Sequence, residues 1–124
     1  MKPVQDIFNL LPEDSYGLIS CEELNERQKK PAAPYILDIR KNEDWKKSRI
    51  TGSVHREWEA VGGLIDSGSL PEDRDIVVVC YVGQSSGQVT GVLRTLGFRA
   101  YSLLDGFNEW QSAGYPVESA AGVN

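Results

Sequence analysis

The chain has 124 residues, which is enough for one domain and too few for two domains of ordinary size. Its composition, 40% hydrophobic and 25% charged, is that of a folded globular domain with a core. The formal net charge of −5 argues against nucleic acid or an anionic membrane as the main partner, and no run reaches the roughly 18 apolar residues of a membrane span. Two cysteines are too few for a disulfide framework and the N-terminus lacks a signal-peptide pattern, so we expect a cytoplasmic protein.

The N-terminal part of the chain alternates extended and helical patterns. We expect residues 1–16 to form an extension, and a first short strand to follow at 17–19. Ser20 and Glu23 have the spacing of a capping box, which predicts that a helix begins there and ends before the next proline. The near-continuous apolar run at 35–39 is typical of a strand buried on both faces.

The middle of the chain has weaker patterns. Asn42 can cap a short helix that runs through Lys47, and residues 50–55 are expected to form another short extended piece. Residues 57–65 have a helical pattern, but two adjacent glycines weaken that prediction.

The rest of the chain is organised around residues 75–96. The β-branched run from Ile76 to Val79 predicts a buried strand, and Cys80 follows it directly. After a short polar loop, i, i+3, i+4, i+7 spacing predicts a helix whose apolar face is formed by Val89, Val92, Leu93 and Leu96.

A last strand at 100–103 and a last helix at 106–113 complete the domain, which we expect to span residues 17–117. Trp110 of that helix is the safest candidate for a core aromatic residue. We expect residues 118–124, which are small and polar, to form a flexible tail.

Strands and helices alternate along the whole chain. This order predicts an α/β fold with a parallel sheet of about five strands and helices on both faces. Ligands of such sheets bind beyond the carboxyl ends of the strands, so Cys80 and Asp38 mark the expected site.

The loop after Cys80 has the residues needed to hold an anion. Gly83 can adopt a positive φ, which lets the backbone N–H groups point inward. Ser85 and Ser86 have short hydroxyls that can donate to a sulfur anion, and we expect one of them to cap the following helix. The helix N-terminus lowers a thiol pKa, so we interpret Cys80 as a nucleophile. These patterns alone leave open that Cys80 only ends a strand as a small apolar residue.

Three other kinds of site are disfavoured. Phosphatases with a cysteine loop carry an arginine six places after the cysteine, and that place is Ser86 here, so a phosphoryl dianion would lack its bidentate partner. Gly83 and Gly87 do not have the spacing of a dinucleotide-binding loop. One histidine and two separated cysteines provide no metal site.

Six segments, which occur in order between Leu18 and Val117, resemble the rhodanese-like sulfurtransferase family. One such segment is weak evidence, but six in order are specific. They are Ile19-Ser20-x-Glu22-Glu23-Leu24, Leu37-Asp38-Ile39-Arg40 with Glu43, Ile50-Thr51-Gly52-Ser53-Val54-His55, the loop Val79 to Ser86, Leu96-Gly97-Phe98, and Leu104-Asp105-Gly106-Phe107-x-x-Trp110. In the last segment, Asp105 stands where the family has the first of two glycines.

The resemblance implies a single rhodanese-like domain that needs no cofactor and no metal. The Cys80 thiolate would take the sulfane sulfur of thiosulfate or a persulfide, and the Cys80 persulfide would pass it to cyanide, a thiol or a protein acceptor. The implied sulfur-binding loop consists of Tyr81, Val82, Gly83, Gln84, Ser85 and Ser86. Many family members carry arginine or lysine in this loop. This one has neither, and its apolar Tyr81 and Val82 favour a protein or low-molecular-weight persulfide donor.

The resemblance also implies residues that support the site. We expect Asp38 to accept backbone N–H bonds near the loop, Arg40 to pair with Glu43, and His55 to have a structural or rim role. Four basic residues are expected to be solvated and are candidates for the cation that the loop lacks: Lys46, Lys47, Arg49 and Arg56.

The alternative to an enzyme is a non-catalytic rhodanese-like module that binds a partner or senses thiol oxidation. The intact Cys80 favours the enzyme, and the loop without a cation keeps the alternative open. We expect Cys21 to be a semi-buried structural thiol, and Trp45 and Trp58 to pack against the protein rather than to bind a ligand.

Overall fold

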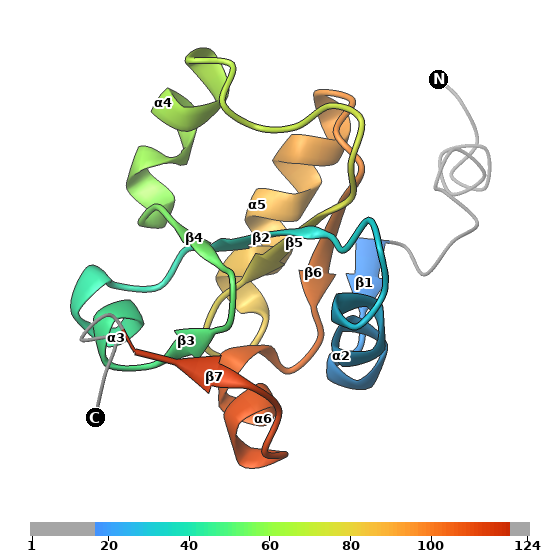
Figure 1. Ribbon diagram of the computed structural model, residues 1–124. Coiled ribbons are helices and arrows are strands. Elements are labelled where there is room, and N and C mark those ends of the chain that lie inside the picture. The colour runs from blue at the N-terminus through green and yellow to red at the C-terminus, as the bar shows by residue number, and fades with distance from the viewer. Residues whose placement is uncertain (1–16, 120–124) are drawn as a thin grey trace, which may run out of the picture.

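A five-stranded parallel sheet forms the centre of the protein, with helices on both faces (Figure 1). The computed structural model describes residues 17–119, so the predicted extension at 1–16 and residues 120–124 lie outside the described residues. The elements are β1 (Leu18–Ile19), α2 (Cys21–Gln28), β2 (Tyr35–Asp38), α3 (Asn42–Lys47), β3 (Arg49–Ile50), β4 (Val54–His55), η2 (Trp58–Ala60), α4 (Val61–Asp66), β5 (Ile76–Val79), α5 (Gln84–Thr95), β6 (Ala100–Leu103), α6 (Gly106–Ser112) and β7 (Val117–Glu118). The main sheet has the order β1-β6-β5-β2-β4, which confirms the predicted α/β fold.

Strand β5 lies in the middle of this sheet, paired with β2 on one side and β6 on the other. Its four β-branched residues are 0% exposed, as a strand covered on both faces requires. Successive side chains point to opposite faces, so Ile76 and Val78 enter one core while Val77 and Val79 enter the other. The central strand therefore holds the start of the following loop firmly.

The two cores lie on opposite sides of the sheet, and each is closed by a pair of helices (Figure 1). On one side, α4 and α5 contribute Leu64 and Leu93. On the other side, α2 and α6 contribute Leu24 and Trp110. Trp110 is fully buried, as predicted, and its indole N–H donates to the carbonyl of Pro116 at 2.9 Å.

Of the three helix caps predicted from the sequence, one is observed in the structure. The Ser20 hydroxyl accepts from the Glu23 N–H at 3.0 Å, so the predicted cap of α2 is confirmed. The prediction for Asn42 is wrong, because α3 has Lys41 at its cap position and no side-chain cap bond. The expectation that Ser85 or Ser86 caps α5 is also wrong, because the cap residue is Gly83 in a left-handed conformation.

The buried face of α5 differs from the predicted one. Val89 and Leu93 are buried, but Val92 and Leu96 are 56% and 57% exposed. The face toward the sheet is completed instead by Ser86 and Thr90, which are 0% and 4% exposed. Apolar periodicity predicted the helix correctly, but it assigned the wrong side of the helix to the sheet. The reason is that buried small polar residues contribute no apolar signal.

The middle of the chain folds into shorter pieces than predicted. Residues 50–55 belong to two strands, β3 and β4, and residues 57–65 divide into η2 and most of α4. Strand β3 forms a second, antiparallel sheet with β7, so Glu118 belongs to a strand rather than to the predicted flexible tail. No helix among residues 17–119 is long and apolar enough to cross a bilayer.

Candidate active site

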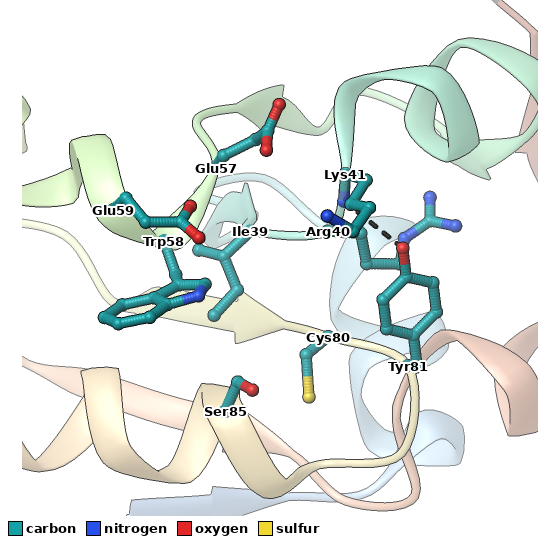
Figure 2. A pocket seen from close by; sticks show the side chains of 9 residues that line it. All are labelled: Ile39, Arg40, Lys41, Glu57, Trp58, Glu59, Cys80, Tyr81 and Ser85. Atoms are coloured by element: carbon teal, nitrogen blue, oxygen red, sulfur yellow. Dashed lines mark hydrogen bonds between the residues drawn. The ribbon is translucent and has the colours of Figure 1, made fainter.

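Cys80 lies directly after β5, at the edge where the parallel strands end. The neighbouring strand β2 ends beside it, and the Ile39 N–H donates to the Val79 carbonyl at 2.9 Å. A pocket of about 170 Å³ opens at this edge, and Figure 2 shows the side chains around it. It is lined by Ile39, Arg40, Lys41, Glu57, Trp58, Glu59, Cys80, Tyr81 and Ser85. The carboxyl ends of β2 and β5 thus lie side by side at the pocket, which is where the sequence predicted a ligand site.

The N-terminus of α6 fixes the backbone of the loop. The Phe107 N–H donates to the Cys80 carbonyl at 2.8 Å, and the Asn108 N–H donates to the Tyr81 carbonyl at 3.1 Å. Two orphan donors of the helix are thereby satisfied, and the loop carbonyls are turned away from the sulfur. The close approach requires Gly106, where an added Cβ would lie 2.6 Å from the Cys80 carbonyl oxygen. The N–H groups of the loop are left free to point inward.

The Cys80 sulfur lies within a cluster of hydrogen-bond donors. The Gly83 N–H donates to Sγ at 3.0 Å, and the Ser86 Oγ lies 3.3 Å from Sγ. Ser86 in turn lies 2.7 Å from the Oγ of Ser102 on β6. Ser102 was not among the residues predicted from the sequence. The available signal was a small hydroxyl residue inside a buried strand, next to the strand that ends at Cys80.

These contacts change the acidity of the Cys80 thiol. Burial alone raises its pKa, because a charged sulfur loses its hydration. Hydrogen bonds from the Ser86 hydroxyl and from the N–H groups of Ser86, Gly83 and Val82 stabilise the thiolate and outweigh burial. The pKa of Cys80 therefore lies below the ordinary value of 9.0. The arrangement favours the thiolate form of Cys80 and supplies donors that can hold an anion.

The loop residues after Cys80 do not all face the pocket. Tyr81 and Ser85 line it, whereas the side chains of Val82 and Gln84 are exposed. The Tyr81 hydroxyl donates to the Asp44 carboxylate and accepts from the Lys41 N–H at 3.3 Å. This pair of bonds joins the loop to the start of α3. Burial, reinforced by Asp44, raises the pKa of Tyr81, so its phenol is protonated near neutral pH.

Asp38 and Arg40 form a buried ion pair under the loop. The Arg40 Nη2 lies 2.9 Å from the Asp38 Oδ2, and the Arg40 N–H also donates to the Asp38 carboxylate at 2.9 Å. The guanidinium packs 3.9 Å from the centre of the Phe107 ring and donates to the Ser48 carbonyl. The predicted pairing of Arg40 with Glu43 is wrong, because Asp38 occupies the guanidinium and Glu43 is exposed. Asp38 was expected to accept N–H groups near the loop, but the backbone N–H that it accepts is that of Arg40. The guanidinium of Arg40 reaches the loop at the Tyr81 ring, 5.8 Å from its centre.

The basic residues that line the pocket are not the ones predicted from the sequence to supply a cation. Arg40 and Lys41 line it, whereas none of the four predicted candidates does. Figure 2 shows the Arg40 guanidinium beside the hydroxyl end of Tyr81 rather than toward the sulfur. Of the four candidates, Arg49 is not solvated as predicted, because it packs 4.0 Å from the Trp45 ring and binds Glu118 at 3.4 Å.

Two aromatic predictions have different outcomes. His55 has the expected structural role: its Nε2 lies 2.7 Å from the Arg40 carbonyl oxygen, and its ring stacks on Trp45 with centroids 5.0 Å apart. Trp58 lies at the surface, where it is 57% exposed and lines the pocket, so its expected role in packing rather than in ligand binding stays a prediction. Its position just after β4 was a usable signal, since ligand-binding residues gather at strand ends.

Comparison with known proteins agrees with this geometry. A family model described as "Rhodanese-like domain" matches residues 20–113. The chain belongs to the rhodanese-like domain family. Thiosulfate sulfurtransferase GlpE of Actinobacillus succinogenes is 36% identical over 115 residues, which cover 92% of this chain and 93% of that protein. The same-named protein of Pseudomonas fluorescens is 38% identical over 88 residues, which cover 70% of this chain and 78% of the relative.

Solved structures show the same fold. The rhodanese-like domain of an Anabaena sp. protein has a TM-score of 0.73 at 27% identity, covering 87% of this chain and 83% of that one. The BH2092 protein of Bacillus halodurans has a TM-score of 0.77 at 16% identity, covering 98% of this chain and 92% of that one. The second likeness shows the fold alone. The rhodanese resemblance of the sequence is confirmed at the level of the family.

Proposed function

We propose that this chain is a sulfurtransferase that carries sulfur as a persulfide on Cys80. The observation that carries the proposal is the set of donors around the Cys80 sulfur, with the Gly83 N–H at 3.0 Å and the Ser86 hydroxyl at 3.3 Å. A persulfide is an anion, so the donors that lower the pKa of the thiol also stabilise the charged intermediate. The family membership and the relatives named thiosulfate sulfurtransferase support the same reading.

The proposed reaction has two displacement steps. The Cys80 thiolate attacks the outer sulfur of thiosulfate, the S–S bond breaks, and sulfite leaves with the electron pair. Cyanide or a thiol then attacks the outer sulfur of the Cys80 persulfide, which restores the thiolate and releases thiocyanate or a new persulfide. A persulfide donor reacts in the same way and leaves as a thiol. No oxidant, metal or cofactor enters either step.

The loop from Tyr81 to Ser86 is proposed to bind the transferred sulfur. Its N–H groups hold the sulfur, and the N-terminus of the 12-residue helix α5 adds its partial positive charge. Asp38 and Arg40 are proposed to keep the loop in place through their buried pair. The proposed partners are a small sulfur donor and a cyanide, thiol or protein acceptor. Both cysteines are free, and we propose that the protein works in the reducing cytoplasm.

Steady-state transfer tests this function. Thiocyanate formation is measured with cyanide as acceptor, once with thiosulfate and once with a persulfide as donor. Cys80→Ser should abolish turnover while the fold is kept, because the two side chains are close in volume. Cys21→Ser should keep near wild-type turnover, since Cys21 contacts the Leu104 and Gly106 carbonyls rather than the pocket. Turnover that survives in Cys80→Ser would refute the proposal.

The second candidate is a module that binds a partner or senses thiol oxidation without catalysis. The observation in its favour is the absence of any lysine or arginine between Cys80 and Ser86, together with Glu57 and Glu59 on the pocket wall. Such a site attracts a dianionic donor weakly. Failure of both donors to transfer sulfur, in a folded protein, would favour this candidate.

A further inference from the structure

The charged side chains of the pocket carry more negative than positive charge, whereas a site for a small dianion would carry an excess of positive charge. Arg40 and Asp38 neutralise each other, because their side chains are 3% and 0% exposed and form a direct ion pair. The remaining charged lining residues are Lys41, Glu57 and Glu59. The walls therefore carry one positive and two negative formal charges. Thiosulfate, with two negative charges, would meet a net negative surface before it reached the sulfur.

Two of these charged groups are available to a ligand. The Glu57 carboxylate lies 3.4 Å from the Asn42 N–H at the start of α3. Lys41 and Glu59, in contrast, are exposed and form no ion pair with any residue of 17–119. Lys41 comes from the connection between β2 and α3, while Glu59 comes from η2. Figure 2 shows the two residues on opposite sides of the pocket, with Cys80 lying below and between them.

Trp58 adds an aromatic surface to the side that carries Glu59. Its side chain is 57% exposed, an unusual position for a tryptophan, and it lines the pocket next to Glu59 in Figure 2. An indole face attracts an ammonium group, and a neighbouring carboxylate strengthens that attraction. The η2 side of the pocket thus suits an ammonium group, whereas the Lys41 side suits a carboxylate.

The size of the pocket limits the ligand. Its volume of about 170 Å³ is smaller than the roughly 300–1,000 Å³ of pockets for drug-sized ligands and cofactors. The site therefore admits a molecule of a few heavy atoms, with its sulfur at Cys80 and its charged groups spread between the two walls. Opposite charges on one small molecule match Lys41 and Glu59 at the same time.

We infer that the pocket selects a small zwitterionic thiol or persulfide, of the chemical class of cysteine, in preference to thiosulfate. The inference rests on the proposed function and names its substrate class. The carboxylate of the ligand faces Lys41, its ammonium group lies between Glu59 and the Trp58 ring, and its sulfur meets Cys80. Glu59 and Lys41 are specificity-determining residues for this transfer.

The sulfur step balances for such a ligand in either direction. As donor, R–S–SH is attacked at its outer sulfur by the Cys80 thiolate, the S–S bond breaks, and R–SH leaves after the proton returns to its sulfur. As acceptor, R–SH loses its proton and attacks the outer sulfur of the Cys80 persulfide, which leaves a Cys80 thiolate and R–S–SH. The charges of R do not change, so they act only through binding and orientation.

The test compares four thiols of similar size as sulfur acceptors. Cysteine carries both charged groups, cysteamine only the ammonium, 3-mercaptopropionate only the carboxylate, and 2-mercaptoethanol neither. Cys80 is loaded from thiosulfate or inorganic polysulfide, excess donor is removed, and the single-turnover rate of persulfide discharge is measured. Each thiol is compared between wild type and variant, so that its intrinsic reactivity cancels.

Glu59→Gln should slow discharge by cysteine and cysteamine roughly two- to fivefold, the effect of one solvent-exposed ion pair. Lys41→Gln should slow cysteine and 3-mercaptopropionate by a similar factor. Neither variant should change the rate with 2-mercaptoethanol. Two exposed residues away from the pocket provide matched controls, and Glu72→Gln and Lys30→Gln should leave all four rates unchanged.

Equal effects on all four thiols, or no effect on any of them, would overturn the inference and leave the proposed function intact. A folded protein whose Cys80 takes up no sulfur from either donor would instead refute the proposed function, and the inference with it. The loading step and the discharge step thus separate the two failures.

Discussion

The hydroxyl oxygens of Ser86 and Ser102 lie 2.7 Å apart in the buried interior between α5 and β6. Ser86 also contacts the Cys80 sulfur, so Ser102, Ser86 and Cys80 form a chain of hydrogen bonds. When the sulfur is a thiolate, Ser86 donates its proton to the sulfur and is free to accept one from Ser102. This geometry predicts that Ser102 is a positioning residue, whose bond orients the Ser86 hydroxyl toward the charge.

Removal of the hydrogen bond between Ser102 and Ser86 should destabilise the Cys80 thiolate relative to the thiol. Ser102→Ala is expected to raise the pKa of Cys80 relative to wild type, because Ser86 no longer has a fixed direction for its proton. The alkylation rate of Cys80 near neutral pH should fall roughly two- to fivefold, as expected for one hydrogen bond of about 1 kcal/mol or less. The pH dependence of iodoacetamide labelling measures both effects.

A double-mutant cycle controls for packing changes around Ser102. Ser86→Ala should lower the alkylation rate more than Ser102→Ala, since it removes the hydroxyl that contacts the sulfur. Once Ser86 is alanine, the further change Ser102→Ala should have little effect on the rate, because the two act in series. Independent, additive effects would show that Ser102 does not act through Ser86.

The two cysteines should differ sharply in reactivity. Burial, helped by the carboxylates of Glu109 and Asp105, raises the pKa of Cys21 to about 11, whereas the pKa of Cys80 is lowered. At about pH 7.5, a limiting amount of iodoacetamide should therefore label Cys80 and leave Cys21 unmodified. Peptide mass mapping measures the sites, and comparable labelling of both thiols would contradict the assigned environments.

The raised pKa of Cys21 also predicts how stability changes with pH. Below about pH 9 the thiol is protonated in both states, so it adds no pH dependence. Between about pH 9 and 11 the unfolded chain loses this proton first, and the free energy of unfolding falls as pH rises. The difference in unfolding free energy between wild type and Cys21→Ser should fall by about 2 kcal/mol across that window. Urea denaturation at several pH values tests this, and a flat difference would disagree.

Among the glycines of residues 17–119, Gly106 should be the least tolerant of substitution. Its φ is +66°, and an added Cβ would lie 2.5 Å from the Tyr81 carbonyl oxygen. Gly106→Ala should destabilise the protein by about 2–4 kcal/mol and displace the loop. Gly114 at the other end of α6 has a φ of +80° but no atom within 4 Å of the added Cβ, so Gly114→Ala should cost only about 1 kcal/mol. Thermal denaturation compares the two, and equal losses would show that the clash at the loop is unimportant.

The sequence predicted the architecture because each main strand has a clear apolar signal. The run from Ile76 to Val79 marked the central strand, and the position of Cys80 after it placed the site at the edge where ligands bind. Local hydrogen-bonding choices were harder to predict. Helix α5 begins after Gly83, which has a left-handed conformation, and no serine side chain caps the helix. The spacing of residues in the sequence does not predict this kind of helix start.

Contacts that form only in the folded chain limited the prediction of the site. Arg40 meets Asp38, two residues away, because both side chains are buried under the loop, whereas Glu43 turns to solvent on α3. Trp58 enters the pocket only because β4 pairs with β2 and delivers the following residues to the same edge. Ser102 of β6 contacts Ser86 of α5, which lies sixteen positions away along the chain. The contacts of Trp58 and Ser102 depend on the order of the strands in the sheet, which a single sequence does not reveal.

The most direct test of a Cys80 persulfide is the intact mass of the protein after incubation with thiosulfate, and separately with a small persulfide donor. We predict a gain of one sulfur atom that cyanide removes, and no gain in Cys80→Ser. A larger gain from the persulfide than from thiosulfate would fit the charges of Lys41 and Glu59 at the pocket. A folded wild-type protein with no gain in mass from either donor, or an equal gain in Cys80→Ser, would contradict a persulfide on Cys80.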